Sequence, residues 1–406
     1  MRLLTLPLFA VSWIDRLGFG LNGKQSTMVV EGPVAEAQLR LFYVTCWVTL
    51  VIFIVVASVL AYATIRFKAR TEADEHAEPP EQGHGNPLVE VGLIGASVLA
   101  LVIIAVPTLK YIWYDYDVPA ESKANAYEVT ATGYQWWFQF QYPSEQITGS
   151  GPLITANELV IPAGRPVHVN LRSVDVMHSF WVPKLAGKVD MIPNRGNFLW
   201  LQADHPGYFW GQCAEFCGDS HALMRFRVIA LSPRDFQDWL AQQMSPAREL
   251  SPSSLRPKAQ FASLEYHDFA ENAPGISGKY EGDNGISPLD QWKQQQFPNK
   301  GEDPELIARG KALFVTKTCA GCHTIRQADG KGPMGVTGPN LTHVGARSTI
   351  AGGFLDNTPE YMRRWIHNPG VVKPGNKMWV LGYEVNHIAL TPEDEVALVA
   401  YLQSLK

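Results

Sequence analysis

Two cysteines, a histidine and a methionine lie within twelve residues near the middle of this 406-residue chain. The segment CAEFCGDSHALM places Cys213 and Cys217 before His221 and Met224. Thiolate, imidazole and thioether ligands suit copper better than calcium, magnesium or manganese. A mononuclear blue-copper site needs only one cysteine. The second cysteine therefore predicts a binuclear copper centre in which both sulfurs are shared.

The remaining imidazole ligand is predicted to be His178, which lies 35 residues before Cys213. This separation suits a partner on a neighbouring strand of a small β-barrel. The alternatives for the cysteine pair are a disulfide or a zinc site. Zinc rarely takes methionine, and the histidine and methionine that follow the pair fit neither alternative well.

The sequence CAGCH at 319–323 is the attachment pattern of c-type haem. The thiols of Cys319 and Cys322 add to the haem vinyl groups, and His323 becomes the proximal iron ligand. This pattern lies in a terminal block of about 100 residues, the size of a small cytochrome c domain. Haem attachment of this kind implies assembly outside the cytoplasm.

The distal haem ligand is predicted to be Met378, in the Pro- and Gly-containing segment KPGNKM. Met334 and Met362 are the rival candidates, and Met362 lies in a segment that reads as a helix, where packing is its ordinary role. Ligation by His and Met suits electron transfer, because no iron position is left open for a substrate. The residue after Met378 is Trp379, where class I cytochrome c domains usually have proline.

The chain contains five cysteines, and the two cofactor patterns use four of them. The fifth, Cys46, lies in an apolar run and is expected to be a small buried apolar residue. No disulfide framework is then possible without removing a cofactor ligand. The formal net charge of -5 argues against nucleic acid as a partner.

Two charge-free apolar runs, 41–65 and 91–109, are each long enough to cross a membrane. The loop between them carries Arg66, Lys68 and Arg70, which predicts a cytoplasmic loop and two extracytoplasmic ends. The soluble domains then lie on the periplasmic or outer side of a bacterial plasma membrane, where c-type haem is attached.

The first residues allow two interpretations. Arg2 followed by the apolar run 3–14 resembles a weak signal peptide with a cleavage site at 10–12. The alternative is a retained segment that lies on the outer membrane surface. Residues 1–40 are assigned to an N-terminal extracytoplasmic segment and 41–112 to the helical hairpin.

Apolar and polar residues alternate after residue 127, with Pro and Gly between the runs, which is typical of strands and turns. This pattern predicts an antiparallel Greek-key barrel of the cupredoxin type over 125–235. Residues 236–300 are predicted to be a linker, because most of them are rich in Pro, Ser, Gly and Gln and lack periodicity. Residues 301–406 are predicted to form an all-α class I cytochrome c domain.

Over about residues 30–235 the chain resembles subunit II of the haem-copper oxidases. The copper-ligand segment carries this resemblance, together with the segment VMHSFW at 176–181 and the aromatic run YQWWFQF at 134–140. With the fused cytochrome the chain resembles the caa3 type. The resemblance implies a CuA site in which Glu215 binds through its backbone carbonyl. The Glu215 carboxylate would be free to face the neighbouring subunit, where it is a candidate ligand for magnesium.

The resemblance also implies roles for four residues outside the ligand sets. Trp136 matches the tryptophan that receives electrons on the way to CuA, as a surface aromatic ring beneath a docked donor. Asp190 and Arg195 match a segment that faces subunit I. Glu90 matches a glutamate at the mouth of a proton path, although the Trp-Thr that often follows it is replaced by Gly95-Ala96-Ser97.

The implied function is electron input to a terminal cytochrome c oxidase of the respiratory chain. Electrons would pass from cytochrome c or a quinol-oxidising complex to haem c, to CuA, and to haem a in subunit I. Subunit I would also hold haem a3 and CuB, subunit III would accompany it, and oxygen would be reduced there with proton pumping. Two alternatives stay open: the small subunit of a CuA-containing nitric-oxide reductase, and a free membrane-tethered electron carrier.

Overall fold

The computed structural model describes residues 21–249 and 286–406, apart from residues 22, 77, 79–82, 84 and 331. The candidate signal peptide lies outside the described residues. The chain divides into two compact units. The first is built mainly from Glu36–Tyr116, and the second from Gly23–Ala35 together with Asp117–Lys406.

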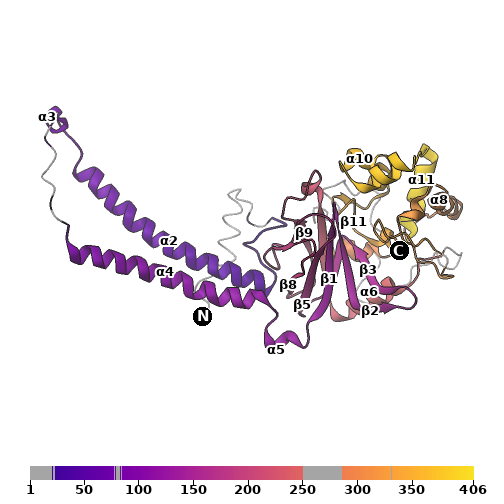
Figure 1. The fold of residues 1–406 in the computed structure, drawn as a ribbon, viewed down its shortest axis with the longest axis horizontal. Helices are drawn as coiled ribbons and strands as arrows, with labels where there is room; N and C mark the ends of the chain where they lie inside the picture. Colours follow the sequence, from indigo (N-terminus) through magenta and orange to yellow (C-terminus); the bar gives the residue numbers. More distant parts are fainter. Residues whose placement is uncertain are drawn as a thin grey trace. The chain divides into compact units, whose positions relative to one another are not determined.

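Two long apolar helices make up most of the first unit (Figure 1): α2 (Pro33–Arg66) and α4 (Pro87–Tyr116), with the short α3 (Glu72–Glu75) between them. They have 34 and 30 residues, and about 20 are enough to span the hydrocarbon core. Both extend beyond the charge-free runs 41–65 and 91–109. Gln38 Nε2 donates to Asp115 Oδ2 at 3.0 Å, so the start of α2 lies beside the end of α4.

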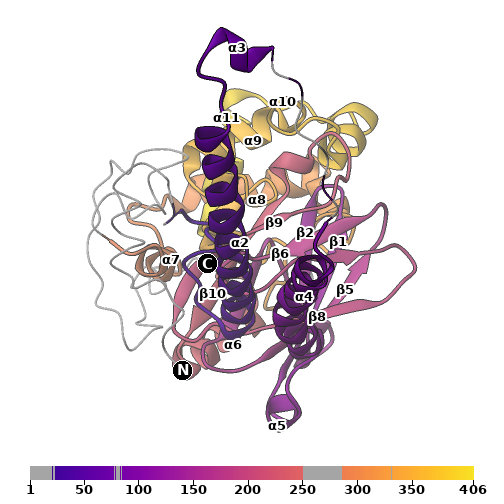
Figure 2. The same cartoon turned by 90° about the vertical axis from the view of Figure 1, so that its left-hand side faces the viewer.

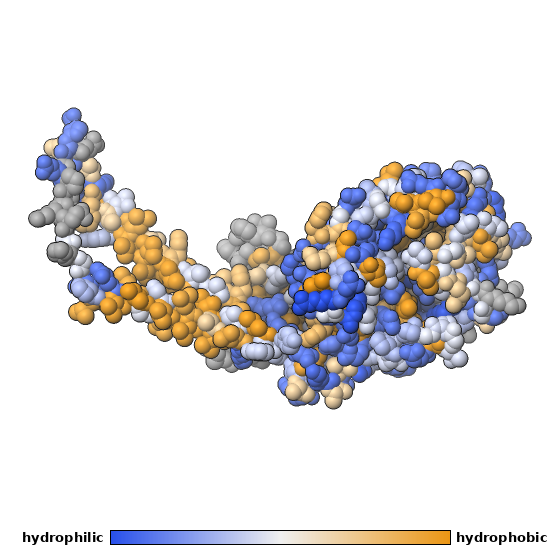
Figure 3. All heavy atoms as spheres, in the orientation of Figure 1, coloured by the Kyte–Doolittle hydropathy of each residue, from blue (hydrophilic) through white to orange (hydrophobic). Residues whose placement is uncertain are grey.

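The faces of α2 and α4 are covered by exposed apolar side chains (Figure 3). Phe53 and Leu101 are 68% and 67% exposed, and Cys46 is exposed too, so the expectation that Cys46 is buried within the protein is wrong. The most apolar window of each helix is 0% buried. A soluble protein would cover such surfaces, so the two helices are suited to lipid.

The second unit begins with two five-stranded sheets, ordered β3-β2-β1-β5-β8 and β4-β10-β9-β6-β7. Most neighbours are antiparallel, as predicted, but β1 pairs with β5 and β4 pairs with β10 in parallel. The strands are β1 (Tyr127–Tyr134), β2 (Trp137–Ile147), β3 (Gly151–Ala156), β4 (Glu158–Pro162), β5 (Val167–Ser173), β6 (His178–Trp181), β7 (Val189–Met191), β8 (Asn197–Leu201), β9 (Gly207–Cys213) and β10 (Arg225–Leu231).

The alternating pattern in the sequence corresponds to the core of this sandwich. Val129, Ile161, Val167, Val169 and Leu171 are fully buried. In β1 and β5 these residues alternate with partly or fully exposed ones, because successive side chains in a strand point to opposite faces. The predicted cupredoxin-like β domain is confirmed, and it takes the form of a sandwich of two sheets.

One helix lies within the stretch predicted to be a linker over 236–300, and another runs into it from residue 233. α6 (Pro233–Met244) and α7 (Pro288–Gln295) each begin with a serine whose side chain caps the helix, followed by proline. Each buries a tryptophan, and Trp292 is 1% exposed. α7 has eight residues, which is too short for a helical period to stand out in the sequence.

The C-terminal residues form the predicted helical domain (Figure 2). Three of its helices begin after a capping residue that is followed by proline: Asp303 caps α8, Thr358 caps α9 and Thr391 caps α11. α8 crosses α11 closely at Gly310, where a Cβ would lie 2.0 Å from Ala397 O. The elements are α8 (Pro304–Thr316), η3 (Cys319–Gly321), η4 (Val344–Ala346), β11 (Thr349–Ile350), β12 (Leu355–Asp356), α9 (Pro359–His367), α10 (Pro369–Val372), η5 (Met378–Val385) and α11 (Pro392–Ser404).

Candidate copper and haem sites

The predicted copper ligands come together at one end of the sandwich. His178 begins β6, Cys213 ends β9, and Phe180 on β6 pairs with Cys213. The loop from β9 to β10 carries Cys217 and His221, and ends with Met224 directly before β10. The strands therefore fix the two ends of the ligand loop.

The ligand atoms lie at distances that suit two metals bridged by two sulfurs. The Sγ atoms of Cys213 and Cys217 are 3.7 Å apart. His178 Nδ1 lies 3.9 Å from Cys213 Sγ, and His221 Nδ1 lies 3.5 Å from Cys217 Sγ. Each sulfur therefore has its own imidazole.

Two further donors complete the set. Met224 Sδ lies 3.9 Å from Cys217 Sγ, and the backbone oxygen of Glu215 lies 3.3 Å from Cys213 Sγ. Cys213, Cys217 and Met224 are buried, whereas His221 and Glu215 are partly exposed. Soft, buried donors arranged in this way fit a binuclear copper centre and fit calcium or magnesium poorly.

A carboxylate orients the first imidazole. Asp175 Oδ1 lies 2.9 Å from His178 Nε2, so Nδ1 of that ring is left to face the sulfurs. Burial disfavours the charged form of Asp175, but hydrogen bonds from His178 and from the backbone N–H groups of Gln135 and Val176 outweigh it and lower the pKa to about 2. The carboxylate is therefore ionised at any physiological pH. Such partners of a ligand histidine fix its tautomer and orientation.

The two buried cysteines interact directly before a metal binds. Their contact lowers the pKa of Cys213 and raises the pKa of Cys217, because one sulfur of the pair is ionised more readily when the other keeps its proton. A metal that binds both sulfurs would displace the remaining proton.

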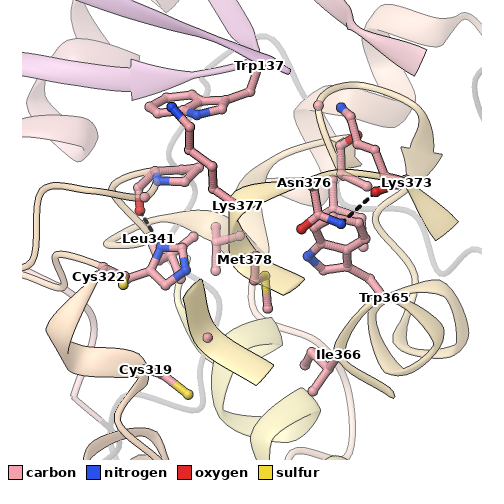
Figure 4. Close-up of a pocket in the computed structure, with 18 of the residues that line it drawn as sticks. Trp137, Cys319, Cys322, Leu341, Trp365, Ile366, Lys373, Asn376, Lys377 and Met378 are labelled. Carbon is pink, nitrogen blue, oxygen red and sulfur yellow. Dashed lines mark hydrogen bonds between the residues drawn. The ribbon is translucent and has the colours of Figure 1, made fainter. Parts of the chain in front are cut away.

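The haem-attachment residues line one side of a pocket in the second unit (Figure 4). Cys319 begins η3 and Cys322 directly follows it, and Met378 enters the pocket from the start of η5. His323 Nδ1 lies 2.8 Å from the carbonyl oxygen of Pro339. Because that oxygen can only accept, Nδ1 carries the proton and Nε2 is free for a metal. Burial lowers the pKa of His323, which keeps the ring neutral and suited to iron.

The three candidate distal methionines lie in different surroundings. Met378 lines the pocket and is partly exposed, whereas Met334 is 60% exposed and is not among the lining residues. Met362 also lines the pocket, but it is 2% exposed and its sulfur accepts a hydrogen bond from Gln403 at 3.7 Å. The geometry favours Met378, with Met362 as a packing residue.

The aromatic run joins the two sites. Trp136 Nε1 donates to the carbonyl oxygen of Cys217 at 2.9 Å, and Trp136 also lines the haem pocket, as do Tyr134 and Trp137. Trp136 is only 6% exposed, so the expectation of a surface ring is wrong. The loop that carries Gly375 covers it, since a Cβ on Gly375 would lie 2.8 Å from the Trp136 ring.

The other predicted residues lie on different elements. Glu90 is exposed in the first turn of α4. Asp190 is on β7, paired with Ser179, and Arg195 is exposed on the turn before β8. Nothing in the described part of the chain assigns them a role, so their roles stay predictions.

Sequence reasoning missed Asp175 and Phe216. Asp175 lies three residues before a ligand histidine, a spacing that could have marked it as the orienting carboxylate. Phe216 lies between two copper ligands and is 76% exposed. Its position between two ligands places an exposed aromatic ring at the copper end of the sandwich.

Replacing Met224 by leucine tests the thioether as a ligand. The side chain is fully buried and leucine is close in volume, so we expect the fold and the copper content to be retained. The near-infrared copper band and the copper reduction potential should both shift. An unchanged band would show that Met224 only packs.

Replacing Met378 by leucine should remove the distal haem ligand while Cys319 and Cys322 keep the haem attached. Methionine ligation raises the haem potential, so the potential should fall and the sulfur-to-iron absorption band should disappear. Met362→Leu, a buried change in the same pocket, is the matched control and should leave both unchanged. The reverse pattern would assign the ligand to Met362.

Comparison with known proteins gives two family matches and several relatives, some of which match over nearly the whole chain. Residues 127–231 match the family described as cytochrome C oxidase subunit II, periplasmic domain, and residues 307–406 match the cytochrome c family. Cytochrome c oxidase subunit 2 of Alkalihalophilus pseudofirmus is 31% identical over 95% of this chain and 93% of its own length. The subunit of the same name from Bacillus subtilis is 28% identical over 94% and 92%. A quinol oxidase subunit 2 of Bacillus cereus is 34% identical over 57% of this chain and 77% of its own length.

Proposed function

Because this chain belongs to the cytochrome c oxidase subunit II family and carries a cytochrome c domain, we propose that it accepts electrons from a donor and delivers them to subunit I of the oxidase. Membership makes the chain a subunit of a haem-copper oxidase, a membrane-anchored protein with a periplasmic domain that associates with subunit I. The path of the electrons, the ligand residues and the coupling to protons are parts of the proposal.

One contact carries the proposal most directly. Trp136 donates to the backbone of Cys217 and also lines the pocket that holds Cys319 and Cys322. A single buried ring therefore touches both cofactor sites. An aromatic ring in this position offers a low-barrier electronic path, so we assign Trp136 to electron transfer between the two sites.

The family implies CuA in the first domain and haem c in the second, and the residues present fit both groups. We assign His178, Cys213, Glu215, Cys217, His221 and Met224 to CuA, and Cys319, Cys322, His323 and Met378 to haem c. When bound, these groups supply one-electron transfer at metal centres that are fully coordinated. The protein holds the ligands, buries the thiols of Cys213 and Cys217 away from water and keeps His323 neutral.

The remaining parts of the proposal concern the membrane and the partner. α2 and α4 would both cross the bilayer, with Arg66 at the end of α2 and the loop that follows it on the cytoplasmic side. The exposed Phe216, with Asp190 and Arg195, would face subunit I, and the Glu215 carboxylate would be available to magnesium there. Subunit I, with haem a, haem a3 and CuB, would reduce oxygen to water and pump protons, with Glu90 at the mouth of a proton path.

Turnover of the purified complex with oxygen and with nitric oxide tests the acceptor, using an artificial donor that reduces the haem. We expect oxygen consumption coupled to proton release. Preferential nitric-oxide turnover would assign the chain to the reductase alternative. Isolation without a large multispan subunit would favour a free electron carrier instead.

A further inference from the structure

A lysine is buried where the cytochrome domain meets the copper domain. Lys373 is 2% exposed and lies five residues before Met378. Its Nζ donates to three backbone carbonyl oxygens from different segments: Trp136, Leu223 at 3.2 Å and Ala351 at 3.1 Å. Figure 4 shows Lys373 at the edge of the haem pocket. One ammonium therefore joins the aromatic run, the copper-ligand loop and the cytochrome domain.

The surrounding contacts leave little room for a different arrangement. Ser220 Oγ donates to Pro374 O at 2.7 Å, and the backbone N–H of Arg225 donates to Gly352 O at 2.8 Å. Gly352 has a φ of +73°, and a Cβ there would lie 2.2 Å from Lys373 Nζ and 2.6 Å from Trp136 O. The two backbones are therefore in close contact directly around Lys373.

Lysine at this position carries a desolvation cost. Among the described residues no carboxylate forms an ion pair with Lys373, so three neutral carbonyl groups replace its hydration. Burial lowers the pKa of Lys373 to about 7, opposed by the charge of Cys217 and aided by Arg225. An apolar side chain of similar length would avoid this cost but would leave the three buried carbonyl oxygens without a donor. The lysine therefore requires the three segments to converge on one point, and buried polar groups of this kind can fix one arrangement among several.

We propose that Lys373 is a positioning residue. It holds the segment 373–377, directly before Met378, against the copper-ligand loop that ends at Met224. Trp136 thereby keeps one place between the haem and copper sites. This inference rests on the proposed function, because position affects the rate only if electrons pass between the two sites. Lys373 acts through the backbone of Trp136 and Leu223 and needs no contact with either metal.

Lys373→Met in the complete complex tests the proposal, since methionine keeps most of the length and removes the ammonium. Lys311→Met, an exposed lysine on α8, is the control for loss of one charge. The first readout is hydrogen exchange of peptides that contain Arg225, whose N–H is bonded across the contact. The second is the rate at which electrons reach copper after flash reduction of the haem.

We expect the Lys373→Met complex to lose exchange protection at Arg225 and to transfer electrons several-fold more slowly, because Trp136 no longer keeps one place between the two sites. The absorption bands and potentials of both cofactors should match those of the unmodified complex. Gly352→Ala should give the same two changes, since it blocks the same contact from the opposite side.

Three results would overturn the inference. Unchanged exchange and unchanged transfer in Lys373→Met and Gly352→Ala would show that the lysine holds nothing. Faster exchange with an unchanged transfer rate would make Lys373 a purely structural residue. Absence of haem-to-copper transfer in the unmodified complex would refute the proposed function, and the inference with it.

Discussion

A Cys217→Ser complex is expected to lose the binuclear copper centre and nearly all oxygen turnover. Cys217 Sγ lies within 4 Å of Cys213 Sγ, His221 Nδ1 and Met224 Sδ, so it is the sulfur around which most of the ligand set is arranged. A serine oxygen is a poor ligand for copper compared with thiolate. The remaining donors include a single cysteine, which suits a mononuclear site.

The expected decrease in turnover is about 1000-fold, which corresponds to roughly 4 kcal/mol. Copper content per haem, the near-infrared band and oxygen consumption measure the effect. Cys46→Ser is the control, because Cys46 is exposed on α2 and is not among the site residues. Retention of a normal copper band in Cys217→Ser would contradict the ligand assignment.

The second large effect is expected for Trp136→Ala. The substitution removes the ring that touches both sites, but it keeps the backbone carbonyl that accepts from Lys373. The domains should therefore stay in contact, with both cofactors bound, while electron transfer from haem to copper slows several-fold because the aromatic path is removed. Flash reduction of the haem, followed by absorbance at the copper band, measures the rate.

Trp136→Phe separates the ring from its hydrogen bond. Phenylalanine keeps an aromatic ring but cannot donate to Cys217 O, so an intermediate rate is expected. Exchange at Arg225 should stay protected in both variants, in contrast to Lys373→Met. A transfer rate in Trp136→Ala equal to that of the unmodified complex would exclude the ring from the path.

Local patterns in the sequence predicted the local parts of this molecule. The copper segment and the CAGCH segment are short, and their chemistry depends on residue types at fixed spacing. The alternation at Val129, Val167 and Val169 predicted the sandwich core, because a half-buried strand repeats every two residues. The charge-free runs predicted the two long helices, although each helix continues past its apolar run.

Features that depend on distant segments could not be predicted in this way. Lys373 lies in an ordinary Pro- and Gly-containing loop, and nothing local shows that three carbonyl groups from other segments surround it. Trp136 looked like a surface ring because the loop that covers it lies more than 200 residues away in the chain. The short helix α7 depends on burial of Trp292, whose indole N–H donates to Glu158 on β4.

Electron transfer within this chain, from haem to copper, can be followed directly by flash reduction of the haem in the purified complex without oxygen, observed at the haem and copper bands. We expect the copper to be reduced as the haem is reoxidised, in a first-order process whose rate does not depend on the concentration of the complex. Copper reduction that depends on concentration, or that does not occur, would exclude transfer within the chain.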